Sequence, residues 1–190
     1  MLNQVLSGFN SKIRLWPLTW VANTARAVGD IIIPTAYASH VYLCSIAGTS
    51  HGTTQPTWNT TNGGTTVDGS ATFVTYDTKT YQVLAPQGST FPYISWGLET
   101  DVPIGTFASP TKIEDLNFWV NVYSNTSINH LSIITDRVLG ILDNASLSVT
   151  GFTSMKCFRT YMGTIIPNLD TAGALIAYQQ PLRYRVMITS

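Results

Sequence analysis

The stretch from Asp115 to Asn144 constrains the fold more than any other part of this sequence. Apolar residues alternate over its first part and predict a strand. The buried row of that strand is expected to be Leu116, Phe118, Val120 and Val122, with Trp119 and Tyr123 on the other face. Residues 124–127 then supply turn and N-cap chemistry, and apolar side chains recur at helical spacing up to Leu142. We therefore predict a strand followed by an amphipathic helix of about four turns that covers one of its faces.

The composition describes a folded protein with few charges on its surface. Of the 190 residues, 44% are hydrophobic and only 11% are charged, which predicts a surface that is buried in an assembly. Ten basic residues balance ten acidic ones, and this balance argues against a polyanionic partner. No apolar run has the length of a signal-peptide core or a membrane span, so we expect a protein made and kept in a reducing cytosol, with no membrane partner.

The first residues predict a short helix. Its apolar stripe is formed by Leu2, Val5, Leu6 and Phe9. We expect Gly8, Asn10 and Ser11 to end this helix early, and so short a helix must dock on a larger apolar surface. The face of the central strand that carries Trp119 and Tyr123 is left for this helix or for a neighbouring subunit. A frayed N-terminus is the alternative.

Residues 14–78 have a different character and predict a compact β module. Twelve threonines lie between Thr49 and Thr80, short strands are expected at 30–33, 40–46 and 70–76, and Asp68-Gly69 is a strong turn signal. The module, over about residues 18–77, resembles a small domain that recurs in phage structural proteins and looks like the chitin-binding type of carbohydrate-binding domain. The matching residues are Trp20, Val28 to Ile31, Tyr42 to Cys44, Gln55 to Trp58 and Asp68 to Phe73.

The aromatic residues of this module allow two interpretations. Aromatic rings stack on sugars, which makes Trp20, Tyr42 and Trp58 candidate glycan-binding residues. In so small a module the same rings must also supply most of the core. Both interpretations stay open at this point.

The remainder of the chain predicts an α+β domain. Strands are expected at 91–97, 116–123, 154–162 and 174–188, and the segment from Leu98 to Lys112 is expected to be a long loop. Pro181 predicts a bulge or an edge position in the last strand. The whole fold is therefore expected to be a mixed or antiparallel sheet with one main helix and a short N-terminal helix, formed by residues 1–13 and 79–190, with residues 14–78 inserted as an all-β module.

Residues 81–188 resemble the tail-completion, or tail-terminator, family of long-tailed bacteriophages. The resemblance is carried by FPYISWG at 91–97, FWVNVYS at 118–124, the helix at 128–143 and LRYRVMI at 182–188. In that family a helix precedes the first strand after a short connection, whereas here the β module separates them. The resemblance implies a virion protein at the phage neck that forms a hexameric ring. This ring caps the tail tube, ends its polymerisation and joins it to the head-completion protein, with DNA only passing through its lumen.

The candidate interface of such a ring combines the long loop with the uncovered strand face. Its residues are Leu98, Val102, Ile104, Phe107, Trp119 and Tyr123. The alternative function is that of a carbohydrate-binding decoration or adhesion protein of the virion, in which residues 14–78 bind a glycan on the host surface.

The sequence contains no recognisable catalytic or cofactor motif. His40, His51 and His130 lack metal-ligand spacing, and no P-loop, dinucleotide fingerprint or G-x-S-x-G is present. Cys44 and Cys157 are expected to be small buried hydrophobic residues rather than a disulfide. We expect no cofactor, no metal and no enzymatic activity.

Overall fold

A computed structural model of the protein describes residues 2–36, 40–77, 79–106, 109–147, 153–154 and 156–189. The chain forms two compact units, one of Met1–Trp16 with Thr80–Ser190 and one of Pro17–Lys79. Mixed sheets and helices make up the described chain, so the predicted α+β class is confirmed.

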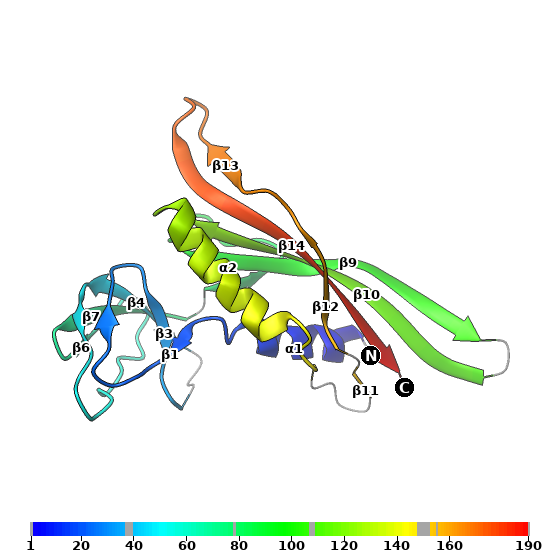
Figure 1. Ribbon diagram of the computed structural model, residues 1–190, viewed down its shortest axis with the longest axis horizontal. Helices are drawn as coiled ribbons and strands as arrows, with labels where there is room; N and C mark the ends of the chain where they lie inside the picture. Colours follow the sequence, from blue (N-terminus) through cyan, green and yellow to red (C-terminus); the bar gives the residue numbers. More distant parts are fainter. Residues whose placement is uncertain are drawn as a thin grey trace. The chain divides into compact units, whose positions relative to one another are not determined.

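One large sheet organises the larger unit (Figure 1). Its elements are α1 (Leu2–Ile13), β8 (Thr80–Gln82), β9 (Tyr93–Thr106), β10 (Ser109–Ser124), α2 (Ile128–Leu142), β11 (Thr153–Ser154), β12 (Phe158–Met162), β13 (Ile166–Leu169) and β14 (Leu175–Thr189). The strand order is β11-β14-β10-β9-β8, and β12 and β13 also pair with β14. The β8–β9 pair is parallel, whereas the other pairs are antiparallel.

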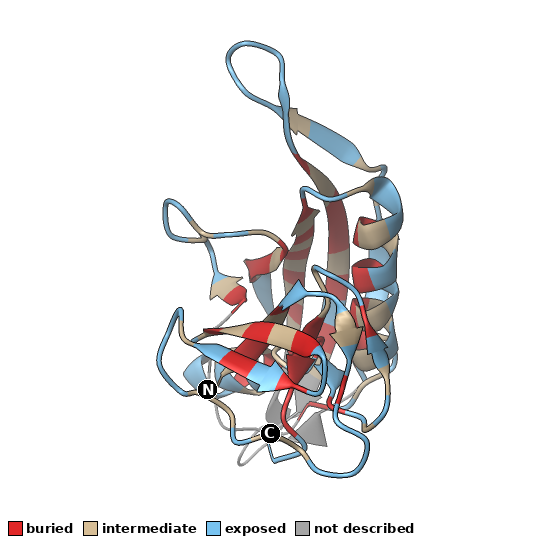
Figure 2. Cartoon of the chain, turned by 90° about the vertical axis from the view of Figure 1, so that its left-hand side faces the viewer, coloured by how far each residue is buried: buried red, intermediate tan, exposed pale blue. Residues whose placement is uncertain are grey.

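The core of this unit lies between one face of the sheet and the two helices. The predicted row of β10 is fully buried, and it faces Leu131, Ile134, Val138 and Leu142 of α2. Figure 2 shows the buried residues on the strands and along the inner side of α2. The predicted helix is confirmed at Ile128–Leu142, and the side chain of Ser127 caps it by accepting a hydrogen bond from the His130 amide.

The N-terminal helix packs on the same face of the sheet as α2. The Phe9 ring stacks on Phe118 at 4.2 Å between centroids and lies 5.1 Å from Trp96. The docking of this helix on the sheet is thereby confirmed, but its suggested place on the Trp119 face is wrong. The predicted early end is also wrong, because α1 continues to Ile13, whose side chain is fully buried. Burial of a third apolar side chain outweighs the cost of about 1 kcal/mol that one interior glycine adds.

The predicted loop from Leu98 to Lys112 is a β-hairpin. Strand β9 runs to Thr106 and β10 begins at Ser109, with a register shift between Asn117 and Phe118. The prolines that suggested a loop are tolerated because Pro103 lies where β9 pairs only with β10, and Pro110 lies beyond the part of β10 that pairs with β14.

Strand β14 pairs with four other strands of the sheet, β10 on one side and β11, β12 and β13 on the other. Its pairing with β10 has no register shift at Pro181, so the predicted bulge is absent on that side. On its outer side the neighbour changes from β12 to β13 next to Pro181, and the Gly163 amide donates to the Pro181 carbonyl at 2.9 Å. The proline therefore marks the place where one outer strand ends and the next begins.

The smaller unit is an all-β module. Its strands are β1 (Leu18–Thr19), β2 (Ala25–Arg26), β3 (Ile31–Ile33), β4 (Val41–Ile46), β5 (Gly48–Thr49), β6 (Thr65–Asp68) and β7 (Ala71–Tyr76). Five of them form a sheet in the order β1-β3-β4-β7-β6, and β2 pairs with β5. Gly69 has a φ of 64° in the turn between β6 and β7, which is the left-handed conformation that the Asp-Gly signal predicted.

Candidate interaction surface

The second face of the large sheet carries aromatic side chains and is not covered by α1 or α2, which both pack on the first. We call it the open face. Across it, Tyr123 lies opposite Tyr93, and Trp119 lies opposite Gly97. The Tyr93 ring is 4.8 Å from Tyr123, 5.1 Å from Phe91 and 5.7 Å from Tyr81, so these rings form one continuous cluster.

Gly97 leaves the space that the Trp119 ring occupies. A Cβ atom at this position would lie 2.7 Å from the indole carbons Cε2 and Cζ2, which is closer than van der Waals contact allows. The absence of a side chain therefore lets the Trp119 ring pack against β9 at Gly97, where it lines a depression.

The depression on the open face has a volume of about 320 Å³. We call it the aromatic groove, and its lining residues are Val83, Leu84, Ala85, Tyr93, Ser95, Trp119, Asn121 and Tyr123. None of these residues is charged. Burial raises the pKa values of the Tyr93 and Tyr123 hydroxyls, so both remain neutral in the physiological range.

A strained turn forms the outer rim of the aromatic groove. Val83 has a φ of 68°, a conformation that is rare for a β-branched residue, and the Leu84 amide donates to the Gln82 carbonyl at 3.0 Å. The turn leaves the Leu84 side chain 80% exposed. Together, the exposed Val83 and Leu84 side chains give the aromatic groove an apolar rim.

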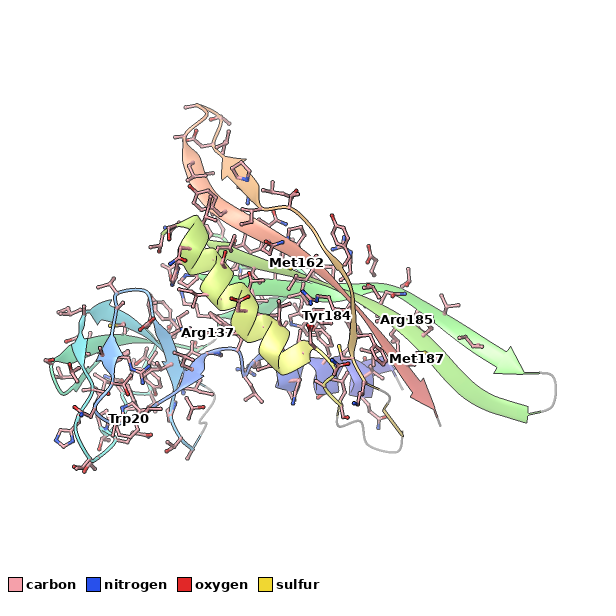
Figure 3. The ribbon with its side chains drawn as sticks, viewed as in Figure 1. Trp20, Arg137, Met162, Tyr184, Arg185 and Met187 are labelled. Atoms are coloured by element: carbon pink, nitrogen blue, oxygen red, sulfur yellow. The ribbon has the colours of Figure 1, made fainter. Side chains whose placement is uncertain are left out.

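The charged residues of the open face are paired with one another. Arg185, labelled in Figure 3, donates two hydrogen bonds to the Asp115 carboxylate, at 2.8 and 2.7 Å. Arg183 Nε lies 2.8 Å from Glu99 Oε2, and Glu99 is the extra residue at the register shift of β9. Because their charges are matched within the chain, these groups do not make the open face a site for a charged partner.

Two hairpins and one outer strand expose further apolar side chains. On the β13–β14 hairpin these are Ile166, Leu169, Leu175 and Ile176. On β12 they are Phe158, Tyr161 and Met162, and on the β9–β10 hairpin they are Val102 and Ile104. Figure 2 shows the β13–β14 hairpin at the top of the view, mostly exposed.

The predicted interface residues fall in three places. Trp119 and Tyr123 line the aromatic groove, Val102 and Ile104 are exposed on the β9–β10 hairpin, and Leu98 lies half-buried opposite Phe118 on the helix-covered face. Phe107 lies outside the described residues. Sequence reasoning missed the rim residue Leu84 and the apolar tip of the β13–β14 hairpin, although the run Ala174-Leu175-Ile176 beside a turn was a usable signal for that tip.

Two of the three candidate glycan-binding residues belong to the core of the module, and the third packs against it. Trp20 (Figure 3) is buried, and its Nε1 donates to Asp68 Oδ2 at 2.7 Å. Tyr42 is buried, and its hydroxyl donates to the Asn59 carbonyl at 3.1 Å. Trp58 packs 4.3 Å from the Tyr42 ring and is partly buried. The predicted glycan-binding role is therefore wrong for Trp20 and Tyr42, because neither ring has a face open to a sugar.

The described residues contain no group of three or more His, Cys, Asp or Glu side chains that could hold a metal ion. Both cysteines are free and buried as expected, and burial raises the pKa of Cys44 to about 11 and that of Cys157 to about 12. Of the helices in the described ranges, none has the length and hydrophobicity needed to cross a membrane.

Comparison with known proteins gives similarity to solved structures but not to curated sequences. No family model matches the sequence, and no curated protein matches it significantly. The chain is similar to a solved structure described as the virion of a native gene transfer agent particle, with 14% identity and a TM-score of 0.47. The match covers 60% of this chain and 81% of that chain.

Proposed function

We propose that this chain is a virion structural protein of a long-tailed phage. In this proposal it is a tail terminator whose copies form a ring on the last ring of the tail tube, stop its polymerisation and present a surface to the neck. The starting point is the sequence resemblance of residues 81–188 to the tail-terminator family.

The observation that carries the proposal is that the chain's own helices cover one face of the large sheet but not the other. The first face is covered by the chain's own helices, whereas the open face keeps an uncharged aromatic groove. Exposed apolar side chains also occur on both hairpins and on β12. So much unpartnered apolar surface favours a subunit that is buried in an assembly over a free monomer.

The two edges of the large sheet favour a ring over a dimer. One edge is the short strand β8, and the other is formed by β11, β12 and β13 along β14. Because the edges differ, contact between them is head-to-tail, and a head-to-tail contact closes into a ring when the rotation between subunits allows it. The hexameric number, the tube protein and the head-completion protein as partners, and the passage of DNA through the lumen are parts of the proposal taken from the resemblance.

Two measurements test the proposed function. Sedimentation velocity of the full chain is expected to show a discrete species several times the monomer mass of 20.8 kDa. Electron microscopy of this species mixed with assembled tail tubes is expected to show a cap at one tube end and an end to tube growth. A stable monomer without affinity for tube ends would contradict the proposal.

A further inference from the structure

The β13–β14 hairpin projects beyond the rest of the large sheet. Strand β10 ends at Ser124, opposite Tyr178, whereas β13 and β14 continue to the Leu169–Leu175 pair. Past Ser124, β13 is therefore the strand that pairs with β14 in the described chain. A two-stranded ribbon is at best marginally stable alone in water. Contact with a partner would therefore stabilise this ribbon.

The tip of this hairpin is apolar, and its turn is held by internal hydrogen bonds. Its exposed apolar side chains are those of Ile166, Leu169, Leu175 and Ile176. Residues 163–178 contain a single charged residue, Asp170. The Asp170 carboxylate is used inside the turn, where Oδ1 accepts hydrogen bonds from the Ala172 and Ala174 amides at 2.9 and 2.8 Å. A turn held in this way presents its apolar side chains with little further loss of conformational entropy on binding.

The aromatic groove has the matching chemistry. Its lining is uncharged, and its rim residue Leu84 is largely exposed. The only charge that the tip brings to this contact is that of Asp170, whose Oδ1 is already hydrogen-bonded inside the turn, and the groove adds no charge of its own. Both surfaces lose exposed apolar area in the same contact.

The positions of the two surfaces in the sheet determine how copies can meet. The groove lies near the end of the sheet where Tyr93 and Tyr123 pair, and Tyr123 also pairs with Gln179 at the base of the hairpin. The two surfaces thus lie at the same end of the sheet, but the groove is on the β8–β9 side and the hairpin on the β14 side. Copies placed side by side in one orientation bring the hairpin of one next to the groove of the next.

We propose that the tip of the β13–β14 hairpin of one copy binds in the aromatic groove of a neighbouring copy. The contact is head-to-tail, because hairpin and groove are different surfaces on opposite sides of the sheet. This inference rests on the self-association that the proposed function assumes, and it names the two surfaces that meet.

Disulfide cross-linking tests the contact directly. Leu169→Cys on the hairpin and Leu84→Cys on the groove rim introduce thiols at exposed positions, while Cys44 and Cys157 are buried and unreactive by comparison. Mild oxidation of a mixture of the two single variants is expected to give covalent dimers that contain one copy of each. Each variant oxidised alone is expected to stay monomeric on a non-reducing gel.

The matched control uses the other hairpin. Val102 is 51% exposed and Leu169 is 54% exposed, so Val102→Cys offers a thiol of similar accessibility. Val102→Cys mixed with Leu84→Cys is expected to give no covalent dimer. Dimers of Leu84→Cys with itself would indicate a symmetric contact and overturn the inference, as would equal cross-linking of Val102→Cys and Leu169→Cys.

Sedimentation distinguishes this inference from the proposed function. The double variant Leu169→Ser/Ile176→Ser changes only exposed side chains, and it is expected to weaken self-association by at least about tenfold because two apolar anchors are lost. Val102→Ser is expected to leave self-association unchanged. A ring that persists in the double variant, or a monomeric wild-type chain, overturns the inference. Cross-linked rings that ignore tail tubes leave the inference standing and remove the tail-terminator function.

Discussion

At the scale of single residues, Gly97 decides the shape of the open face. The Trp119 ring occupies the space above β9 that any side chain at position 97 would fill. The alternation of β10 predicted that Trp119 faces away from the buried row, but not what it packs against. That partner depends on the register between two strands, and the register includes a shift that residue patterns do not reveal.

Gly97→Ala is expected to destabilise the larger unit by about 1–3 kcal/mol, because the new methyl group displaces the Trp119 ring. Gly140→Ala is the matched control, since Gly140 lies in α2 and a Cβ atom there would extend into open space. This control is expected to stabilise the protein by about 0.5–1 kcal/mol through helix propensity. Chemical denaturation of both variants measures the difference, and equal effects would contradict the assigned role of Gly97.

The buried thiol of Cys157 predicts a loss of stability in alkaline solution. Burial, with a smaller effect from Asp143, raises its pKa from 9.0 to about 12. Above the unfolded value the unfolded chain releases the proton while the folded chain keeps it, so stability is complete below pH 9.0 and falls as the pH rises toward 12. Unfolding free energies at about pH 8 and about pH 10 are expected to differ less in Cys157→Ala than in the wild type. An unchanged pH dependence in the variant would argue against this thiol as the source.

At the scale of elements, the helix–sheet arrangement was predictable in part. The buried row of β10 follows from periodicity and is confirmed. Of the predicted helix stripes, α1 buries Val5 and Phe9 with Leu6 half-buried, and α2 buries its stripe residues from Leu131 to Leu142 but leaves Ile128 exposed. The face on which α1 docks was not predictable, because both faces of β10 carry large aromatic side chains. The choice follows from the fit of Phe9 between Phe118 and Trp96, which is a matter of three-dimensional packing. The β9–β10 hairpin was not predicted because its prolines suggested a loop. These prolines lie where their strand has a hydrogen-bonded neighbour on one side at most, and a strand tolerates proline there.

Phe9→Ala is expected to release α1 from the sheet. Loss of a fully buried aromatic ring costs about 3–5 kcal/mol, and a helix as short as α1 does not persist alone in water. Hydrogen exchange is expected to show loss of protection in residues 5–13, and Ser7→Ala, an exposed position on the same helix, is the control. Persistent protection of α1 in Phe9→Ala would show that other contacts hold the helix.

At the scale of the whole molecule, the chain leaves the larger unit and returns to it at neighbouring points. The Trp16 indole Nε1 donates to Thr80 Oγ1 at 3.0 Å, and both residues are buried in the larger unit. The module from Pro17 to Lys79 lies between them in sequence and has a core of its own. This arrangement is that of a domain inserted in a surface connection.

Replacing Pro17–Lys79 by a flexible linker of about four residues is expected to leave the larger unit folded, since its two ends already touch. Circular dichroism and a cooperative thermal transition measure the outcome. A shortened chain without a cooperative transition would show that the larger unit needs the module to fold. Retained self-association would in addition place the contacts between copies in the larger unit.

The Trp16–Thr80 contact also affects the order in which the protein can fold. Bringing Trp16 against Thr80 requires closure of a loop of roughly sixty residues when the module is unfolded, and of only a few residues once the module has formed. Because the module precedes the large sheet in sequence, it leaves the ribosome first and is able to fold before β9 and β10 exist. A module that has already folded therefore shortens the loop that must close before the first helix reaches its sheet, and so lowers the entropy cost of that step.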